Sequence, residues 1–214
     1  MTAVIEQYHD RVRNDVFAIV PEHAGRLLDV GGGVGATSAA LKAQGRATSV
    51  TLVDQVAVEV AAGVDQAFAG DLDDVSLIER VVDEAGPFDT MICLDVLEHL
   101  RDPWTTVAQM HAGLVPNGCL VISLPNMNHL GVVKALVLKG RFDLTDSGIM
   151  DRTHLRWFTR ATAVELATGS GLKLEQVQDN IYDPRYKRVN RLTFGLFARF
   201  FATQFVIRVR RVDG

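Results

Sequence analysis

Apolar residues along this chain form short runs, and stretches with helical spacing lie between them. Phe88–Leu94 and Cys119–Leu124 are largely apolar along their length and do not alternate with polar residues. Such runs are typical of strands that are covered on both faces, as in a parallel sheet flanked by helices. In chain order, the segments with strand character are Arg26–Val30, Ser49–Val53, Ala67–Ala69, Phe88–Leu94, Cys119–Leu124, Lys173–Asn180 and Gln204–Val212.

Helical segments separate most of these runs. Gly35–Ala43 follows a glycine turn, and Asp74–Ala85 carries apolar residues at helical spacing. Asp102-Pro103 starts a third helix with a capping side chain and a proline at the first helical position, and Thr159 caps a fourth. The alternation predicts a doubly wound α/β fold, with a mostly parallel seven-stranded sheet and helices on both faces.

The composition is ordinary for a globular chain, with 48% hydrophobic and 22% charged residues and a formal net charge of −4. The charge is uneven, because residues 185–214 hold eight basic residues and one acidic residue, so that the rest of the chain is strongly acidic. An acidic body does not favour a surface that tracks nucleic-acid phosphates. We therefore expect no nucleic-acid partner.

No apolar run approaches the roughly 18–20 residues that a membrane-spanning helix needs, and residues 1–20 lack the apolar centre of a signal peptide. Both cysteines, Cys93 and Cys119, lie in apolar runs, which favours buried reduced thiols and a cytoplasmic location. Neither cysteine belongs to a cluster with zinc-like spacing, and no acidic cluster resembles a magnesium site. We therefore expect no metal.

The basic C-terminal region also carries Phe194, Phe197 and Phe201 at helical spacing. With the surrounding arginines, residues 190–201 are compatible with an interfacial helix on an anionic membrane. Such a stripe is more often part of the core or of a dimer contact, and we favour that interpretation, with a homodimer as the assembly it would allow.

The first strand-like run ends in a glycine-rich turn, residues 31–35, that leads into a helix. Glycines let the backbone approach a ligand closely, and the helix that follows presents free N–H groups. Gly31 and Gly33 satisfy the relaxed dinucleotide fingerprint, but Asp29 stands two residues before Gly31. A carboxylate there would repel a pyrophosphate, whereas it suits the ammonium and sulfonium groups of S-adenosyl-L-methionine.

Acidic residues recur at the ends of the next strand-like runs. Asp54 ends the second run, where a carboxylate can accept hydrogen bonds from the ribose hydroxyls of either cofactor. Asp71 and Leu72 follow the third run, where the acid can accept the adenine amino group and the apolar side chain can pack on the ring. Asp95 ends the fourth run, at the sheet edge where such folds bind ligands. Four acids at successive strand ends favour one shared site.

Five segments, in this order and spacing, resemble the successive motifs of class I (Rossmann-like) S-adenosylmethionine-dependent methyltransferases: LLDVGGGVG, TLVD, AGDLDD, FDTMICLDVLEHLRDP and LVPNGCLVISLPN. They cover about residues 26–126. The later stretch LPNMNHLGVVKALVLKGRFDLTDSGIMDRTHLRWFT resembles a bacterial subgroup associated with glycan and polysaccharide biosynthesis. The family usually has Gly-Cys-Gly in the turn where this chain has three glycines, a change that the backbone geometry should tolerate.

The resemblance implies binding of S-adenosyl-L-methionine and release of S-adenosyl-L-homocysteine. The positions that match the family's cofactor contacts are Asp29, Gly31, Gly33, Asp54, Asp71, Leu72 and Asp95, with Tyr8 in the leading segment expected near the methionine end. The chain then divides, within a single methyltransferase domain over residues 1–214, into a leading helix in 1–25, a cofactor-binding core in 26–125, a substrate-side helical and loop insertion in 126–158, and a closing helix with strands in 159–214.

Methyl transfer to an oxygen requires that the acceptor lose a proton, and a histidine is suited to take it. We favour His154 as the base, since Asp151 three residues earlier is placed to orient the imidazole. His99, one helical turn after Asp95, is the second choice, and His129 is expected near the mouth of the site on the substrate side.

Arg152 and Arg156 are candidates to hold an anionic part of the substrate through bidentate contacts. The alternative is that they pair with the nearby acids Asp143, Asp146 and Asp151. The motifs lack the signature expected for methylation of planar amines, so we expect O-methylation of a hydroxyl on a glycan or another small molecule.

Three other functions stay open at this point. The first is phenolic O-methylation of the quinone-biosynthesis type. The second is an NAD-dependent oxidoreductase, which uses the same glycine turn but leaves Asp29 without a role. The third is a noncatalytic cofactor-binding subunit, which would bind the cofactor product without turnover.

Overall fold

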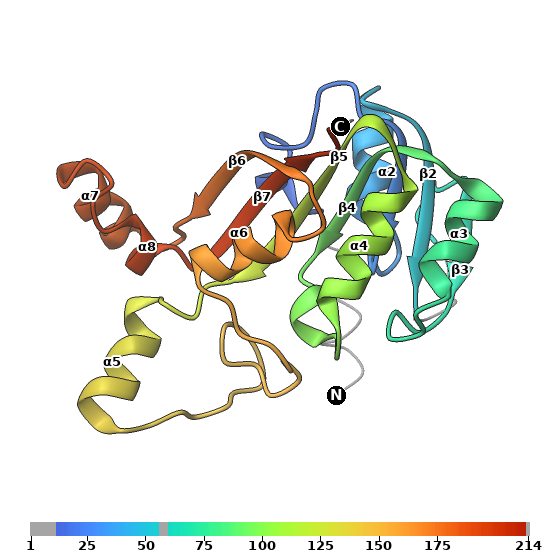
Figure 1. Ribbon diagram of the computed structural model, residues 1–214. Helices are drawn as coiled ribbons and strands as arrows, with labels where there is room; N and C mark the ends of the chain where they lie inside the picture. The colour runs from blue at the N-terminus through green and yellow to red at the C-terminus, as the bar shows by residue number, and fades with distance from the viewer. Residues whose placement is uncertain (1–11, 56–59, 213–214) are drawn as a thin grey trace.

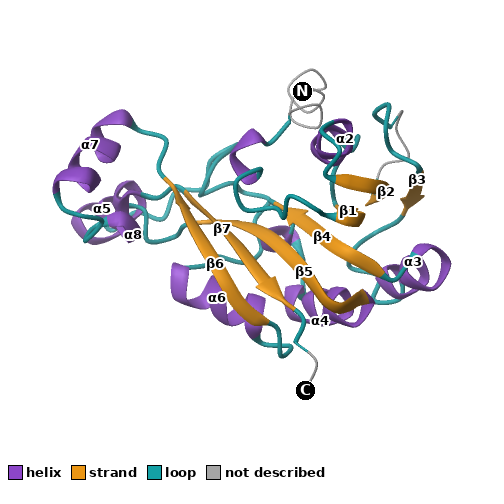
Figure 2. Ribbon diagram, turned by 90° about the horizontal axis from the view of Figure 1, so that it is seen from above, coloured by secondary structure: helices purple, strands orange, loops and turns teal. Residues whose placement is uncertain are grey.

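A computed structural model describes residues 12–55 and 60–212, and a single sheet runs through it. All seven predicted strands are present, in the spatial order β3-β2-β1-β4-β5-β7-β6 (Figures 1 and 2). Their bounds are β1 Gly25–Val30, β2 Ala47–Asp54, β3 Gln66–Ala69, β4 Phe88–Leu94, β5 Leu114–Pro125, β6 Lys173–Asn180 and β7 Gln204–Arg210.

The sheet is mixed, and the prediction of a mostly parallel sheet is corrected. The four pairings among β3, β2, β1, β4 and β5 are parallel, whereas β7 pairs antiparallel with both β5 and β6. The physical reason lies in the connection: the chain leaves β6, forms its helices beyond the end of that strand, and returns from the same side into β7 (Figure 1). An antiparallel neighbour needs no crossover connection. Because β7 is buried along its length, its apolar pattern is the same for either strand direction, so the sequence does not indicate which one it takes.

Helices cover both faces of the sheet, as predicted. Figure 2 shows α3 (Leu77–Ala85), α4 (Pro103–Gly113) and α6 (Arg160–Thr168) on one face, and α2 (Ala36–Ala43) with the short 3-10 helix η1 (Asn14–Val16) on the other. Successive strand residues serve opposite faces: Met91 and Cys93 pack in the core under α3, α4 and α6, whereas Ile92 between them packs in the core under α2 and η1. This alternation between two apolar cores explains why the strands read as continuous apolar runs.

Local capping signals place two of these helices where the sequence predicts them. The Asp102 side chain accepts a hydrogen bond from the Thr105 N–H at the start of α4, and Pro103 occupies the first turn. Thr159 forms a capping box with Thr162 at the start of α6. Both free cysteines are buried, as expected.

Of the expected leading helix in residues 1–25, the described part, residues 12–25, contains only η1, which is followed by a turn before β1; residues 1–11 lie outside the described residues. The start of β5 is irregular, because Asn117 has a φ of 61° and the pairing with β4 shifts register there. Residues 190–201 are not one helix, because the left-handed backbone of Phe194 and Gly195 separates α7 (Pro184–Leu192) from α8 (Ala198–Phe201).

The segment between β5 and α6 contains α5 (Leu130–Lys139) and a long loop, and it projects from the sheet together with α7 and α8 (Figure 1). Another short 3-10 helix, η2 (Leu97–His99), follows β4. The loop after α5 returns to η2, where the backbone N–H groups of Leu155 and Arg156 both donate to the Glu98 carbonyl, at 2.8 and 3.0 Å. No helix in residues 12–55 and 60–212 is long and apolar enough to cross a membrane.

Candidate active site

The glycine turn lies at the carboxyl edge of the sheet, between β1 and α2. Gly31, Gly33 and Gly35 have φ values of 70°, 60° and 79°, a left-handed region that favours glycine. A Cβ on Gly31 would also run into the Val96 side chain that follows β4. The turn therefore needs glycine for its backbone conformation and for its close approach to the end of β4, and it leaves the N-terminus of α2 facing the same edge.

Asp29 lies behind this turn and is 2% exposed. Burial raises its pKa to about 6, and the negative charge of Asp54 adds to the rise, although hydrogen bonding to Ser38 opposes it. The carboxyl group occupies the space beside Gly32, where a Cβ would overlap it. In this conformation Gly32, the middle one of the three consecutive glycines, leaves room for the Asp29 side chain, so a residue with a side chain there would require Asp29 to turn away.

The other predicted cofactor acids of the first half lie at the same edge. Asp54 accepts a hydrogen bond from the Gly33 N–H at 2.8 Å, which ties the end of β2 to the glycine turn. Asp71 follows β3 and accepts hydrogen bonds from the Gln55 side chain at 3.1 Å and from the Asp73 N–H at 2.9 Å. The structure thus brings Asp29, Asp54 and Asp71 to consecutive strand ends. Tyr8 lies outside the described residues.

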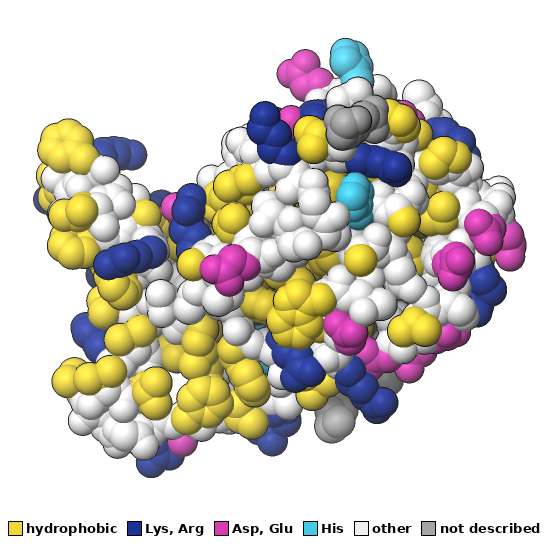
Figure 3. All heavy atoms as spheres, viewed as in Figure 1, with side chains coloured by type: hydrophobic (Ala, Val, Ile, Leu, Met, Phe, Trp, Pro, Cys, Tyr) yellow, Lys and Arg dark blue, Asp and Glu magenta, His cyan; other side chains and the backbone are white. Residues whose placement is uncertain are grey.

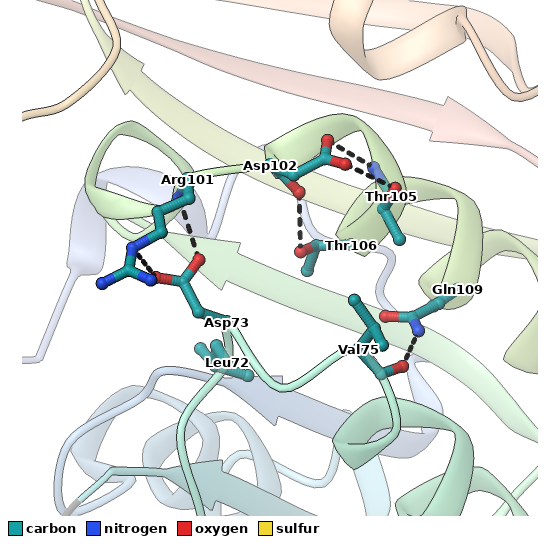
Figure 4. Close-up of a pocket in the computed structure, with 8 residues that line it drawn as sticks. All are labelled: Leu72, Asp73, Val75, Arg101, Asp102, Thr105, Thr106 and Gln109. Carbon is teal, nitrogen blue, oxygen red and sulfur yellow. Dashed lines mark hydrogen bonds and ion pairs between the residues drawn. The ribbon is translucent and has the colours of Figure 1, made fainter.

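Leu72 is buried and lines a small cavity between the loop after β3 and the start of α4 (Figure 4). In that view Arg101 points toward Asp73, and Gln109 reaches across to the Val75 carbonyl. The cavity holds about 90 Å³, less than the roughly 300 Å³ of a small ligand pocket. It therefore borders the predicted adenine position and is too small to be the cofactor site itself.

A larger hollow, of about 380 Å³, opens at the opposite edge of the sheet. It is lined by residues such as Asp89, Asn117 and Arg210, from the amino end of β4, the start of β5 and the last residue of β7. Because the four acids lie at the other edge, we assign this hollow no part in the site.

Asp95 lies at the centre of a polar network after β4. Its backbone is left-handed, with a φ of 59°, and its carboxylate accepts a hydrogen bond from the Ser123 hydroxyl at 2.8 Å. Arg13 forms an ion pair with it, and the Gln204 amide also donates to it. Three elements distant in the sequence therefore hold this one carboxylate.

Arg13 is a site residue that sequence reasoning missed. Besides Asp95, its guanidinium contacts the Asp15 carboxylate at 2.9 Å and the Gln204 side-chain oxygen at 2.7 Å, and its backbone N–H donates to Thr37 of α2 at 3.1 Å. This places a cation beside the glycine turn and the end of β4. No local pattern marks Arg13, because its main partner lies 82 positions later in the chain.

The two favoured catalytic histidines meet at the end of η2. The rings of His99 and His154 are edge to face, with their centroids 4.7 Å apart. Burial lowers the pKa of His154, and the neighbouring His99 lowers it further. The predicted orientation of His154 by Asp151 is wrong: the Nδ1 atom of His154 lies 3.1 Å from the Ile149 carbonyl oxygen, and the Asp151 carboxylate accepts instead from the N–H and hydroxyl of Thr153.

Glu98, between Asp95 and His154 in space, is a second residue that the sequence interpretation left out. It is 1% exposed, and burial, together with the charge of Asp95, raises the pKa of its carboxyl well above the usual range. The sequence signal was present, since Glu98 lies in the LDVLEHL stretch, but a glutamate beside a helix start usually faces solvent.

The three residues predicted on the substrate side make contacts with other groups. His129 caps α5, where its ring accepts a hydrogen bond from the Gly131 N–H at 3.2 Å and lies against Tyr186. Arg152 pairs with Asp146 at 2.6 Å, as the alternative expected, and both side chains are exposed. Arg156 donates to the Arg101 carbonyl, so its guanidinium links the loop to the start of α4.

The protein family described as a methyltransferase domain matches residues 4–177 of the chain. The chain belongs to this family. It is 31% identical over 186 residues to the "Ubiquinone biosynthesis O-methyltransferase" of Xylella fastidiosa (strain 9a5c), a match that covers 81% of this chain and 71% of that protein. The protein of the same name from Psychrobacter arcticus is 29% identical over 170 residues, and the match covers 76% of this chain and 65% of that protein.

Among solved structures, the fold resembles the 1,6-didemethyltoxoflavin-N1-methyltransferase of Burkholderia thailandensis, a crystal structure with bound S-adenosylhomocysteine. The TM-score is 0.62 at 19% identity, over 99% of this chain and 87% of that one. The predicted class I methyltransferase fold is confirmed, and with it the cofactor, S-adenosyl-L-methionine. The glycan-associated subgroup finds no support in these relatives, two of which are named for ubiquinone biosynthesis.

Proposed function

We propose that this methyltransferase transfers the methyl group of S-adenosyl-L-methionine to a hydroxyl group of a small molecule, and that the preferred acceptor is a phenol. The observation that carries the proposal is the pair of imidazoles, His99 and His154, beside the end of β4. They adjoin the polar network of Asp95, which we assign to the cofactor. An oxygen acceptor has to lose its proton, and a neutral imidazole is suited to take it near pH 7.

The cofactor is assigned to the carboxyl edge of the sheet. Asp29 and the glycine turn would receive the methionine end, and Asp54 would accept from the ribose hydroxyls. Asp71 and Leu72 would contact the adenine. Arg13 is the half-buried cation at this edge, and its charge complements the carboxylate of the methionine moiety.

When bound, S-adenosyl-L-methionine would supply an activated methyl group, which the acceptor oxygen would attack on the side opposite the sulfur. The O–C bond would form as the C–S bond breaks, with the bonding electrons kept by sulfur, and S-adenosyl-L-homocysteine would be released. The hydroxyl proton passes to an imidazole nitrogen of His154 or His99. The chain's own part is to position the acceptor and to accept this proton.

The basicity of the imidazoles favours a phenol over a sugar hydroxyl. Burial lowers the pKa of His154, which makes this side chain a weak base. A phenol, with a pKa of about 10, gives up its proton to such a base far more readily than an aliphatic hydroxyl does. The names of the two relatives also favour a phenolic acceptor.

The test is methyl transfer from radiolabelled S-adenosyl-L-methionine to two acceptors in parallel, a catechol with an apolar ring substituent and a methyl hexoside. We expect label in the catechol product. His154→Ala and His99→Ala should each reduce the rate by about 10²-fold or more, the usual contribution of a general base, whereas His23→Ala should leave it unchanged. His23 is a matched control because it is an exposed histidine before β1.

Calorimetry with S-adenosyl-L-homocysteine and with NADH separates the remaining alternatives. Binding of the product analogue together with phenol methylation supports the proposal. Labelling of the hexoside alone would contradict a phenolic acceptor and would favour a glycan acceptor. Product binding without transfer to either acceptor would favour a noncatalytic subunit, and binding of NADH alone would contradict the cofactor assignment.

A further inference from the structure

Three metal-ligating side chains converge next to the proposed acceptor position. Glu98 and His99 come from η2, and His154 comes from the loop that returns from α5. One ligand atom from each lies within 4.8 Å of the ligand atoms of the other two. Glu98 and His154 are buried, and His99 is partly exposed. The cluster is thus largely shielded from water but reachable through His99.

The Glu98 carboxylate has an oxygen that lacks a partner. Its Oε2 atom is buried and makes no hydrogen bond with the described part of the chain. A buried carboxylate oxygen without a partner is costly, so such an atom normally meets a proton or a cation. The cation nearest in the network, Arg13, is already paired with Asp95 and Asp15. The same carboxyl group supplies one of the three ligand atoms of the cluster that the two imidazoles complete.

Both imidazoles are oriented as metal ligands are. The Nδ1 atom of His99 lies 3.2 Å from the Thr153 carbonyl oxygen, and the Nδ1 atom of His154 lies 3.1 Å from the Ile149 carbonyl oxygen. With the proton on Nδ1, each ring donates to a backbone carbonyl and keeps the lone pair of Nε2 free. Metal-binding histidines almost always donate their second ring N–H to a carbonyl or carboxylate in this way.

We propose that Glu98, His99 and His154 bind one divalent transition-metal ion, with Zn²⁺ the best match to this ligand set, and leave a fourth position for a water or an acceptor oxygen. Two imidazoles and one glutamate are the protein ligands of a known class of open zinc sites. A three-ligand site of this kind lowers the pKa of an oxygen bound at the open position. The inference rests on the proposed function only for the identity of that oxygen.

Metal binding requires a small contraction of the cluster. With bonds of about 2 Å, a tetrahedral ion holds its ligand atoms roughly 3.3 Å apart, so side-chain rotations must bring the three atoms closer. Asp151 supports the ion from outside the ligand set, because its carboxylate interacts electrostatically with both imidazoles. It also fixes Thr153, whose carbonyl faces His99. In the metal-bound state the imidazoles are ligands, and the hydroxyl would lose its proton while bound to the ion.

The test is calorimetric titration of the full, tag-free and chelator-stripped chain with Zn²⁺, together with the visible spectrum of the Co²⁺ form. We expect one ion per chain and a tetrahedral Co²⁺ spectrum. Glu98→Gln, His99→Ala and His154→Ala should each weaken binding by more than the roughly 10- to 100-fold that loss of an outer-shell partner costs. Asp151→Ala should weaken it within that range, and His23→Ala and His111→Ala should bind as the parent does.

Two results would overturn the inference: a parent chain that binds neither ion, or ligand variants that bind as tightly as His23→Ala. Glu98→Gln preserves the shape of the side chain, and circular dichroism of each variant shows whether it is folded. Both titrations use no cofactor and no acceptor. The metal site can therefore fail while methyl transfer is found, and methyl transfer can fail while the metal site is found.

Discussion

At the scale of single residues, the candidate site contains one buried carboxyl group to which residues 12–55 and 60–212 supply no ion pair. Asp29 is 2% exposed, and its pKa is raised to about 6. Near neutral pH the group is therefore ionised at a cost to the folded state. A cationic ligand that docks against it would recover that cost, which supports the role that we propose for Asp29 in binding S-adenosyl-L-methionine.

The pH dependence of cofactor binding follows from this pKa. If Asp29 binds the methionine end, as we propose, its ionised form attracts the ammonium group of S-adenosyl-L-homocysteine, and its protonated form does not. We expect the affinity to rise as the pH increases from 5 to 7 through about 6 and then to level off. Calorimetry across this range checks the expectation, and Asp29→Asn should bind weakly with a flat profile. A parent profile as flat as that of the variant would contradict the role of Asp29.

The same substitution should stabilise the fold, although it weakens cofactor binding. The pKa of Asp29 is higher in the folded than in the unfolded chain, so its stabilising contribution is present below pH 4 and is lost as the pH rises through about 6. At pH 8, Asp29→Asn should raise the free energy of unfolding by about 2–3 kcal/mol. Urea denaturation at pH 4 and pH 8 tests this, with no gain expected at pH 4.

Arg13 and Asp95 form a second residue-level unit, held between η1 and the end of β4. Arg13→Ala leaves the Asp95 carboxylate without its cation and removes a charge that complements the cofactor. We expect a loss of about 1–3 kcal/mol in unfolding free energy and weaker binding of S-adenosyl-L-homocysteine. Arg80→Ala is the control, because Arg80 of α3 makes an exposed ion pair with Asp74, which precedes that helix. If both substitutions changed the unfolding free energy and the binding of S-adenosyl-L-homocysteine equally, Arg13 would have no special role in the site.

At the scale of elements, helix starts follow local chemistry closely. The capping box of α6 joins Thr159 and Thr162, with the Thr159 N–H donating to the Thr162 hydroxyl at 2.9 Å. The direction of β7 follows no such local signal. It depends on where α7 and α8 return the chain, and the buried pattern of the strand would be the same in either direction.

The capping box can be tested against a helix start that lacks one. Thr159→Ala should lower the free energy of unfolding by about 1 kcal/mol. Ser76 is the matched control, since it occupies the N-cap of α3 without a side-chain capping bond. Ser76→Ala should change stability by less than about 0.5 kcal/mol. Thermal unfolding of both variants provides the measurement, and equal losses would show that the box adds nothing.

At the scale of the whole molecule, α5, α7 and α8 extend beyond the layered sheet and carry much of the exposed apolar surface. Figure 3 shows hydrophobic side chains gathered over this projecting part, and the most exposed of them include Val137, Leu138, Phe194 and Leu196. The aromatic stripe of the sequence is split: Phe201 is buried and stacks on Tyr186, whereas Phe194 is 98% exposed.

This split predicts opposite responses within one stripe. Phe201→Ala should cost roughly 3–5 kcal/mol of unfolding free energy, as truncation of a buried phenylalanine does. Phe194→Ala should change it by less than about 0.5 kcal/mol. Co-sedimentation with anionic liposomes tests the membrane interpretation of the same segment. We expect the parent and a variant with Phe194→Ser and Leu196→Ser to behave alike, and binding lost only in the variant would establish membrane contact.

The sequence by itself determined the seven strands, the four helices α2, α3, α4 and α6 that cover the sheet, the place of the glycine turn, and the acids that end the strands. These features depend on local periodicity, on capping and on backbone conformations that only glycine adopts readily, so they are written in neighbouring residues. The order of the strands along one sheet edge then brings Asp29, Asp54 and Asp95 together without further information.

Only the tertiary structure decided the partners. In the structure β7 is antiparallel to its neighbours, and Arg13 forms an ion pair with Asp95. Glu98 lies beside His154, and Asp151 accepts a hydrogen bond from Thr153. Each of these contacts depends on how separate elements pack against one another. The periodicity of apolar residues predicts whether a residue is buried, but it does not predict which distant residue lies beside it.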